Sequence, residues 1–214
     1  IPTQNRTVNN YFIQNNKKHG FTLVEVIIII SINTVMLLVI STSIVNLYQS
    51  NSYIMAQSHE IDQARLGLQS WLNDTEEMTY ADDGTFPIAV MEDNHFGFYS
   101  DVDDEPSVEY LEYELSSTTL YKNTYKSSGF PPIYDLVTPV KTETLSKYVQ
   151  NFDQATSTFS YFDTNGNLLS TTTALLTDVR YIEARVIVNI DPLRSPGEFL
   201  LRSGTSPRNL KDNL

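Results

Sequence analysis

The sequence predicts an α+β fold in which one long N-terminal helix packs on an antiparallel β-sheet. Between Phe21 and Tyr80 there is no proline and one glycine, so nothing in this segment interrupts a helix. The first half of the segment is apolar and the second half is amphipathic. From Phe86 onward the composition changes to tyrosine, phenylalanine, valine and threonine with short turn signals, which is typical of strands.

The apolar half of the expected helix is long enough to span a membrane. The run from Phe21 to Leu47 holds 27 residues, or about 40 Å of helix. Lys17 and Lys18 precede it, so the positive-inside rule places that end in the cytoplasm and everything after Tyr48 outside it. No small-x-small cleavage site follows the run, so we expect the run to stay with the mature protein.

Past the membrane, apolar residues recur at helical spacing and predict that the helix continues to about Met78. One stripe is formed by Leu47, Ile54, Ile61 and Leu68, and the adjoining stripe by Ala64, Trp71, Leu72 and Met78. Three heptad repeats are too few to favour a coiled coil, so we expect this face to pack on the sheet. Asp82-Asp83-Gly84 is the expected end of the helix, because glycine readily takes the left-handed cap.

The region after residue 80 holds several strand signals. Leu111, Tyr113 and Leu115 alternate with glutamates, and residues 119–125 are the expected hairpin partner. Asn165-Gly166, between aromatic residues and leucines, predicts a hairpin over 160–169. Two more strands are expected at 181–190 and 199–201. The first of them would place Ala184, Val186, Val188 and Ile190 on one face and Glu183, Arg185 and Asn189 on the other.

The most specific stretch directly precedes the apolar run. Lys17-Lys18-His19 is followed by Gly20-Phe21-Thr22-Leu23-Val24-Glu25, so a carboxylate lies five residues into a membrane-spanning helix. Such a charge costs a few kcal/mol and by default indicates a function. The stretch resembles the processing site of the type IV pilin and pseudopilin family. The plainer alternative is an ordinary signal anchor that carries a glutamate near its end.

The resemblance implies roles for three residues. A prepilin peptidase is expected to cut between Gly20 and Phe21 on the cytoplasmic face and to methylate the new amino terminus of Phe21. Glu25 then becomes the fifth residue of the mature protein, and its carboxylate is expected to face the terminal amine of a neighbouring subunit during filament assembly. The physics agrees, because an anion in a low-dielectric helix bundle needs a cation, and no other charged residue lies between Phe21 and Met55.

The same resemblance divides the chain into four parts. These are a leader peptide at 1–20, a transmembrane and filament-core helix at 21–48, an amphipathic helix that continues it at 49–80, and a β-rich globular pilin domain at 81–214. Within the family, the globular part looks most like J-type pseudopilins and W-type minor pilins. This looser likeness rests on Glu112-Tyr113-Glu114-Leu115, Leu120-Tyr121, Tyr161-Phe162-Asp163 with Gly166-Asn167, and Arg208-Asn209.

Composition argues against several classes of function. Without its first 20 residues the chain keeps 26 acidic and 11 basic residues, a formal charge of −15, which disfavours binding to nucleic acid. Cysteine is absent, which excludes disulfides and thiolate chemistry. His59 and His95 fit no metal-binding or catalytic spacing, and there is no nucleophile elbow or phosphate-binding glycine loop. We therefore expect no enzyme and no cofactor other than calcium.

Calcium has two candidate places. Asp101, Asp103, Asp104 and Glu105 form a dense acidic cluster that could bind a hard cation, although acidic runs in loops are more often merely solvated. The stretch Asp163-x-Asn165-Gly166-Asn167 superficially looks like a calcium loop. Its glycine is fourth rather than sixth and Ala174 is at the twelfth place, so a hairpin turn is the better interpretation.

Together these features predict a minor pilin or pseudopilin, a structural subunit of a type IV pilus, type II secretion or competence-type filament. We expect a single-pass protein of the cytoplasmic membrane with its C-terminal domain outside, which then enters a filament or reaches the cell surface. Its expected partners are prepilin peptidase, other pilins or pseudopilins, and the membrane. One rival is a pilin-derived adhesin or uptake receptor whose outer domain, with its many tyrosines, binds a surface or substrate. Another is a bitopic membrane protein unrelated to filaments.

Overall fold

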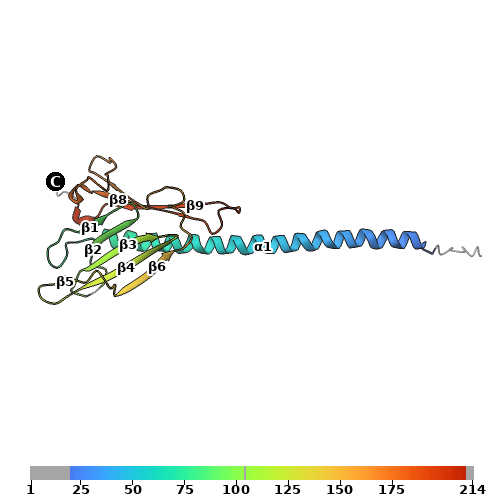
Figure 1. Ribbon diagram of the computed structural model, residues 1–214, viewed down its shortest axis with the longest axis horizontal. Coiled ribbons are helices and arrows are strands. Elements are labelled where there is room, and N and C mark those ends of the chain that lie inside the picture. The colour runs from blue at the N-terminus through green and yellow to red at the C-terminus, as the bar shows by residue number, and fades with distance from the viewer. Residues whose placement is uncertain (1–19, 104, 211–214) are drawn as a thin grey trace, which may run out of the picture. The chain divides into compact units, whose positions relative to one another are not determined.

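The computed structural model describes residues 20–103 and 105–210 of the chain. The chain divides into two compact units, residues 1–50 and 51–214. One helix, α1 (Leu23–Glu76), contributes its first half to one unit and its second half to the other (Figure 1). The long N-terminal helix predicted from the sequence is confirmed.

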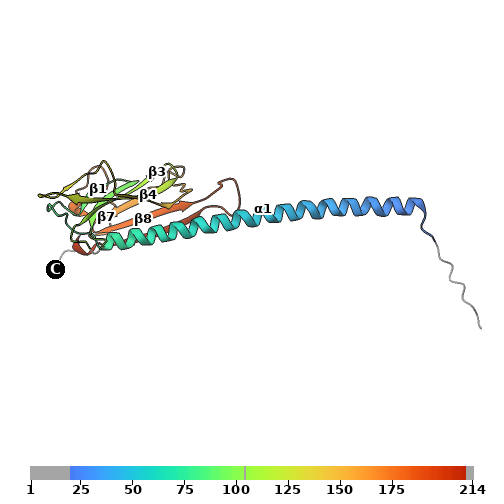
Figure 2. The same cartoon turned by 90° about the horizontal axis from the view of Figure 1, so that it is seen from below.

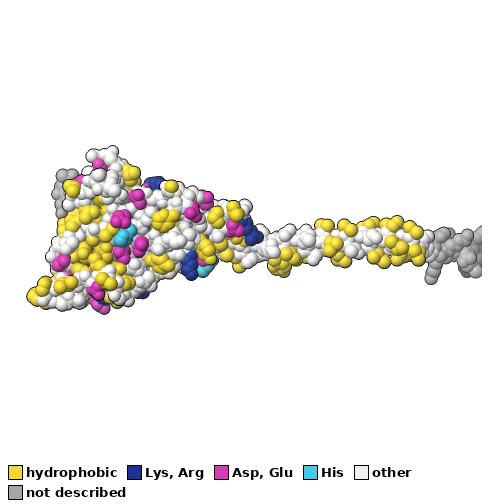
Figure 3. All heavy atoms as spheres, viewed as in Figure 1, with side chains coloured by type: hydrophobic (Ala, Val, Ile, Leu, Met, Phe, Trp, Pro, Cys, Tyr) yellow, Lys and Arg dark blue, Asp and Glu magenta, His cyan; other side chains and the backbone are white. Residues whose placement is uncertain are grey.

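The described part of the first unit is almost entirely the N-terminal half of α1. Every residue from Gly20 to Ser50 is exposed, and hydrophobic and uncharged side chains cover the visible face of this helix (Figure 3). Its hydroxyl groups turn back onto the backbone: Ser31 Oγ donates to the Ile27 carbonyl at 2.8 Å, and Thr42 Oγ1 donates to the Leu38 carbonyl at 3.1 Å. Such internal bonds satisfy polar groups where water is absent. Within the described ranges, α1 is the one helix long and apolar enough to cross a membrane.

The second unit holds two antiparallel sheets and thereby confirms the α+β class. The first sheet has the order β1-β2-β3-β4-β5, and β6 also pairs with β4. Its strands are β1 (Ile88–Met91), β2 (His95–Ser100), β3 (Glu109–Ser116), β4 (Thr119–Ser128), β5 (Ile133–Tyr134) and β6 (Lys141–Ser146). The second sheet has the order β7-β8-β9. Its strands are β7 (Phe159–Phe162), β8 (Tyr181–Val188) and β9 (Phe199–Thr205), and two short 3-10 helices, η1 (Leu176–Asp178) and η2 (Arg208–Leu210), flank β8 and β9.

The second half of α1 runs along one side of these sheets (Figure 2). Ala64, Leu68 and Trp71 from the helix form a single hydrophobic core with side chains of both sheets. The sheet residues of this core include Phe96, Phe98, Leu111, Tyr113, Leu115, Phe159, Tyr161, Ile182, Ala184, Val186 and Val188. Gly67 allows β6 to approach closely, because a Cβ at this position would lie 2.8 Å from Leu145 Cβ. The whole core lies beyond residue 60, so a fragment that starts at residue 51 retains all of it.

The buried stripe of α1 begins one residue away from the predicted stripe. Ile54 is 48 % exposed, whereas Tyr53 and Gln57 are buried. Gln57 Nε2 donates to the Val188 carbonyl at 3.1 Å, and Gln57 Oε1 accepts from the Ile190 N–H at 2.9 Å. The amide thus continues the hydrogen bonding of β8 beyond its last residue. These hydrogen bonds hold the Gln57 side chain inward. A pattern of apolar residues could not predict them.

The helix also ends earlier than predicted. It stops at Glu76, and Met78 is buried in a β-bridge to Ser100 at the end of β2. The prediction that Asp82-Asp83-Gly84 caps the helix is wrong. Gly84, with a φ of +84°, closes a separate turn in which its N–H donates to the Ala81 carbonyl at 2.9 Å. Pairing with β2 takes over from helical hydrogen bonding before this turn is reached.

The strands agree with the prediction in pairing more than in burial. β3 and β4 form the expected hairpin, and β9 covers the expected last strand and extends it. β8 does not have one polar face, because Glu183 is 1 % exposed and Asn189, just beyond its end, is buried as well. Glu183 Oε1 accepts from Arg185 Nε at 2.7 Å, and its other oxygen pairs with Arg202 of β9. Two arginines therefore make this buried carboxylate tolerable.

The predicted hairpin over 160–169 keeps its turn but not its second strand. Asp163 Oδ1 accepts from the N–H groups of Asn165 and Asn167 at 2.8 Å each, and Gly166 has a φ of +79°. The returning segment contributes a bridge between Phe162 and Leu168, whereas β7 pairs mainly with β8. The interpretation of this stretch as a turn is confirmed, and Asp163 serves the turn itself.

Candidate functional site

The N-terminal motif lies at the start of α1. Gly20 and Phe21 precede the first helical residue, Leu23, and Glu25 lies in the first turn, while the rest of the expected leader lies outside the described residues. Gly20 is exposed, and a Cβ added there would meet no described atom within 4 Å. Packing within the described chain therefore places no demand for glycine at this position.

Thr22 and Glu25 close the first turn of α1 as a capping box. The Thr22 N–H donates to Glu25 Oε2 at 3.3 Å, and the Glu25 N–H donates to Thr22 Oγ1 at 3.2 Å. This reciprocal pair satisfies two backbone N–H groups that the start of a helix leaves without partners. Sequence reasoning missed this role, although Thr-x-x-Glu before an apolar run is its usual signature.

The Glu25 carboxylate is only partly engaged by this cap. Both hydrogen bonds that it accepts, from the Thr22 N–H and from Thr22 Oγ1 at 3.5 Å, end on Oε2. The side chain is exposed, and an anion in the first turn is favoured by the helix dipole. The arrangement leaves a carboxylate at the start of the apolar helix that can accept a cation from outside its own turn.

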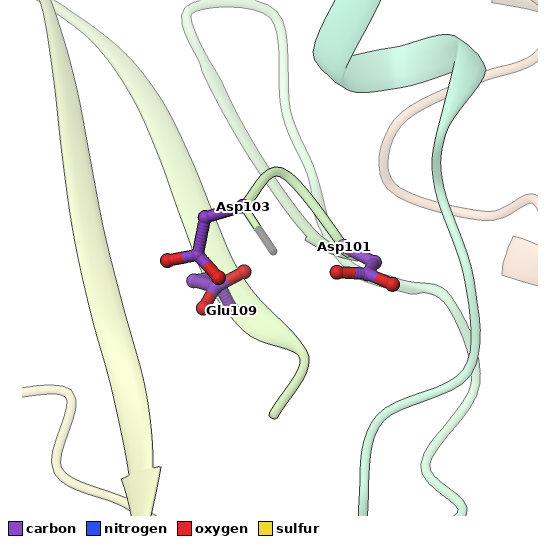
Figure 4. Close-up of side chains that lie close together, drawn as sticks. All are labelled: Asp101, Asp103 and Glu109. Atoms are coloured by element: carbon purple, nitrogen blue, oxygen red, sulfur yellow. The ribbon is translucent and has the colours of Figure 1, made fainter. Parts of the chain in front are cut away.

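A second candidate site lies between β2 and β3. One carboxylate oxygen from each of Asp101, Asp103 and Glu109 lies within 4.8 Å of the other two (Figure 4). Asp101 and Asp103 belong to the acidic cluster expected from the sequence, but Glu109, the first residue of β3, was not expected. It lies on the same face of β3 as the buried Leu111, so strand alternation could have revealed it.

The other two expected members of the acidic cluster are not brought into this group. Glu105 Oε2 accepts from Lys126 Nζ at 2.7 Å instead. Asp104 lies outside the described residues. The hydrogen bonds from Lys126 and from the Glu105 N–H hold the pKa of Asp103 below its usual 3.8.

The two described histidines lie apart. His59 is exposed on α1, and His95 is at the start of β2, with its Nε2 2.7 Å from Glu112 Oε1. Six tyrosines are buried in the second unit, so much of the tyrosine content serves the core, as expected for good strand residues. They are Tyr53, Tyr99, Tyr110, Tyr113, Tyr125 and Tyr161.

Comparison with known proteins identifies the N-terminal site. Residues 15–41 match the family model described as the prokaryotic N-terminal methylation motif. The match spans Gly20, Phe21 and Glu25 together with most of the apolar run, up to residue 41. No curated protein matches the chain significantly.

Proposed function

We propose, on the premise that residues 15–41 carry a type IV prepilin-like signal, that this type IV pilin-like protein is a minor pilin or pseudopilin. The observation that carries the proposal is the motif itself, with a carboxylate in the first turn of an apolar helix whose residues from 23 to 50 are all exposed. A helix that is apolar on every side requires a bilayer or other helices around it. The membrane provides the bilayer, and a filament whose core is a bundle of such helices provides the surrounding helices.

Processing comes before assembly in this proposal. Prepilin peptidase cuts between Gly20 and Phe21, and the new amino terminus is methylated. No described atom lies within 4 Å of a Cβ added at Gly20, and this supports the assignment because packing within the described chain does not require glycine there. We expect Gly20→Val to accumulate as uncut precursor with a folded outer domain. Mass spectrometry of the N-terminus measures the cut, and normal cleavage of this variant would contradict the processing step.

Cleavage changes the surroundings of Glu25. It creates an ammonium group on Phe21, directly before the capping residue Thr22. In the filament, the carboxylate of one subunit pairs with the N-terminal ammonium of a neighbour, and this pairing compensates a charge that is costly in the bilayer. The carboxylate therefore favours the assembled state over the membrane-inserted monomer.

The capping box requires an experiment that separates charge from helix capping. Glutamine at position 25 can still close the box, whereas Glu25→Ala removes the charge and the half of the cap that the Glu25 side chain makes. Thr22→Val is the matched control, because it removes the hydroxyl cap and keeps the carboxylate. We expect all three proteins to be cut, inserted and folded. Both Glu25 variants should enter filaments at least about tenfold less than wild type, which corresponds to about 1.4 kcal/mol, and Thr22→Val should assemble nearly normally.

Sheared filaments and membranes, blotted for this subunit, give the result. If Glu25→Gln assembles like wild type while Glu25→Ala does not, the cap rather than the charge is the assembly determinant. If both assemble normally, Glu25 has no role in assembly, and a position at the filament tip or a binding role of the outer domain becomes the better interpretation.

A further inference from the structure

The carboxylates between β2 and β3 carry more negative charge than their surroundings neutralise. Asp101, Asp103, Glu105 and Glu109 carry four formal negative charges, and Lys126 is the cation within 4 Å of three of them in the described chain. Lys126 Nζ is 2.9 Å from Asp103 Oδ2 and 2.7 Å from Glu105 Oε2. A formal charge of −3 therefore remains on this group.

Glu109 is the residue for which this imbalance matters most. Its side chain is 1 % exposed, and Oε2 accepts from the Val102 N–H at 3.3 Å. Oε1 is buried with no hydrogen-bond donor, and Lys126 Nζ, at 3.8 Å, is too far to provide one. Burial, followed by the neighbouring Asp103, raises the pKa of the Glu109 carboxyl above its usual 4.5. A buried carboxylate oxygen without a donor or cation is costly.

The Glu109 carboxylate lies close to the two exposed aspartates, because one of its oxygens is within 4.8 Å of an oxygen of each. The close-up shows Asp103 beside Glu109, with Asp101 on the far side of the same connecting segment (Figure 4). Asp101 and Asp103 also line an open cleft of about 770 Å³, which gives an ion and its water ligands access from solvent. The site thus joins one buried ligand to two ligands on an open surface.

The donor set selects a hard cation. Three carboxylates without histidine or cysteine suit calcium or magnesium rather than zinc or copper. Calcium accepts roughly six to eight oxygen ligands in flexible geometry, whereas magnesium demands a near-ideal octahedron and loses its water reluctantly. Three carboxylates from neighbouring segments, with water beside them, therefore suit calcium better than magnesium.

We propose that Asp101, Asp103 and Glu109 bind a calcium ion, with water completing its shell and Lys126 remaining with Glu105. The ion provides the partner that Glu109 Oε1 lacks, and it ties the segment after β2 to the first residue of β3. The site is independent of the filament role of Glu25 and would function in any protein with this outer domain. The alternative is that Lys126 is the sole counter-ion and the aspartates are merely solvated.

Calorimetric titration and thermal unfolding of the full-length protein in detergent micelles, after removal of metals with a chelator, test the proposal. Calcium chloride should bind with a dissociation constant of about 0.1–1 mM, as for extracellular sites. At ten times that concentration it should raise the unfolding midpoint by about 3–6 °C, and the same concentration of magnesium chloride should raise it less.

Three variants separate the two interpretations. Asp101→Asn, at an exposed position, should abolish the calcium response without impairing folding. Glu109→Gln should abolish it too, and without metal it should be at least as stable as wild type because an unpaired buried charge is gone. Lys126→Met should bind calcium several-fold more tightly, because it removes a competing cation.

Glu114→Gln on exposed β3 surface is the matched control and should respond to calcium as wild type does. No calcium binding to wild type, an equal response to magnesium, or a response that survives both Asp101→Asn and Glu109→Gln would overturn the proposal. If Lys126→Met is less stable than wild type and calcium does not raise its unfolding midpoint, the lysine is the sole counter-ion of these carboxylates.

Discussion

The buried contact between α1 and the first sheet gives the sharpest prediction about stability. Asp74 on α1 accepts hydrogen bonds at Oδ2 from Lys122 Nζ of β4 and from Tyr113 Oη of β3. The side chains of Asp74 and Lys122 are 11 % and 10 % exposed, and Tyr113 is fully buried. Charged groups this far from water tolerate the loss of a partner poorly.

The two single substitutions should differ in cost. Asp74→Leu leaves both the Lys122 ammonium and the Tyr113 hydroxyl without an acceptor, so it should lower the free energy of unfolding by about 4–5 kcal/mol. Lys122→Met leaves the carboxylate with the tyrosine hydroxyl, so about 3 kcal/mol is expected. The double variant removes both charges and leaves one hydroxyl without its acceptor, which should cost no more than about 1–2 kcal/mol.

Urea unfolding of the fragment 51–214, followed by the fluorescence of its single tryptophan, measures these values. The double-mutant cycle should give a coupling energy of several kcal/mol, because the double variant is more stable than either single variant. Additive costs, or single costs below about 1 kcal/mol, would refute the reasoning. They would mean that the lysine reaches water and that the contact with Asp74 contributes little.

Two further predictions concern the same fragment. Trp71 is 1 % exposed and packs against Phe159 with ring centroids 6.3 Å apart. Trp71→Ala should therefore lower the free energy of unfolding by about 3–5 kcal/mol, measured by urea unfolding followed by circular dichroism. A cost below about 1 kcal/mol would place Trp71 outside the core. Although burial raises the pKa of Glu112, hydrogen bonds from Tyr125, His95 and Asn123 outweigh it and hold the pKa below 4.5. The stability that ionised Glu112 contributes should therefore be present above pH 4.5 and be lost as the pH falls through the lowered pKa. The difference in unfolding free energy between wild type and Glu112→Gln should accordingly shrink from pH 6 to pH 3. A difference that stays constant over this range would contradict the assignment.

Apolar periodicity predicted the large features of the fold and missed features that depend on polar pairing. The helix, its burial of Trp71 and the hairpin of β3 with β4 follow from local patterns that report which face is buried. The inward position of Gln57 depends on backbone groups of β8, more than 130 residues away. The early end of α1 depends on Ser100 of β2. Neither partner is visible in a window of ten or twenty residues.

The candidate sites divide in the same way. The N-terminal motif is contiguous in sequence, so its resemblance to a prepilin processing site, and with it the expected roles of Gly20, Phe21 and Glu25, could be read from one short stretch. In the acidic group, Asp101 and Asp103 of the expected cluster lie together in the structure, and Glu109 joins them. The density of acidic residues in the sequence does not show which carboxylate the start of β3 turns inward. Strand alternation, extended two residues back from Leu111, places Glu109 on the same buried face of β3.

The four carboxylates in unfavourable surroundings differ in how completely the chain compensates them. Glu183 has two arginines, and Asp74 has a lysine and a tyrosine hydroxyl. Among the described residues, Glu25 accepts hydrogen bonds from Thr22, and Glu109 has one backbone N–H and a lysine that is too far to donate. A carboxylate with partners inside the chain serves folding, so its removal should appear in unfolding experiments. A carboxylate that the chain leaves incompletely paired is destabilising unless something outside the chain completes it. We therefore assign external cations to Glu25 and Glu109: a neighbour's amine to Glu25 and calcium to Glu109. We assign none to Glu183 and Asp74, whose partners lie within the chain.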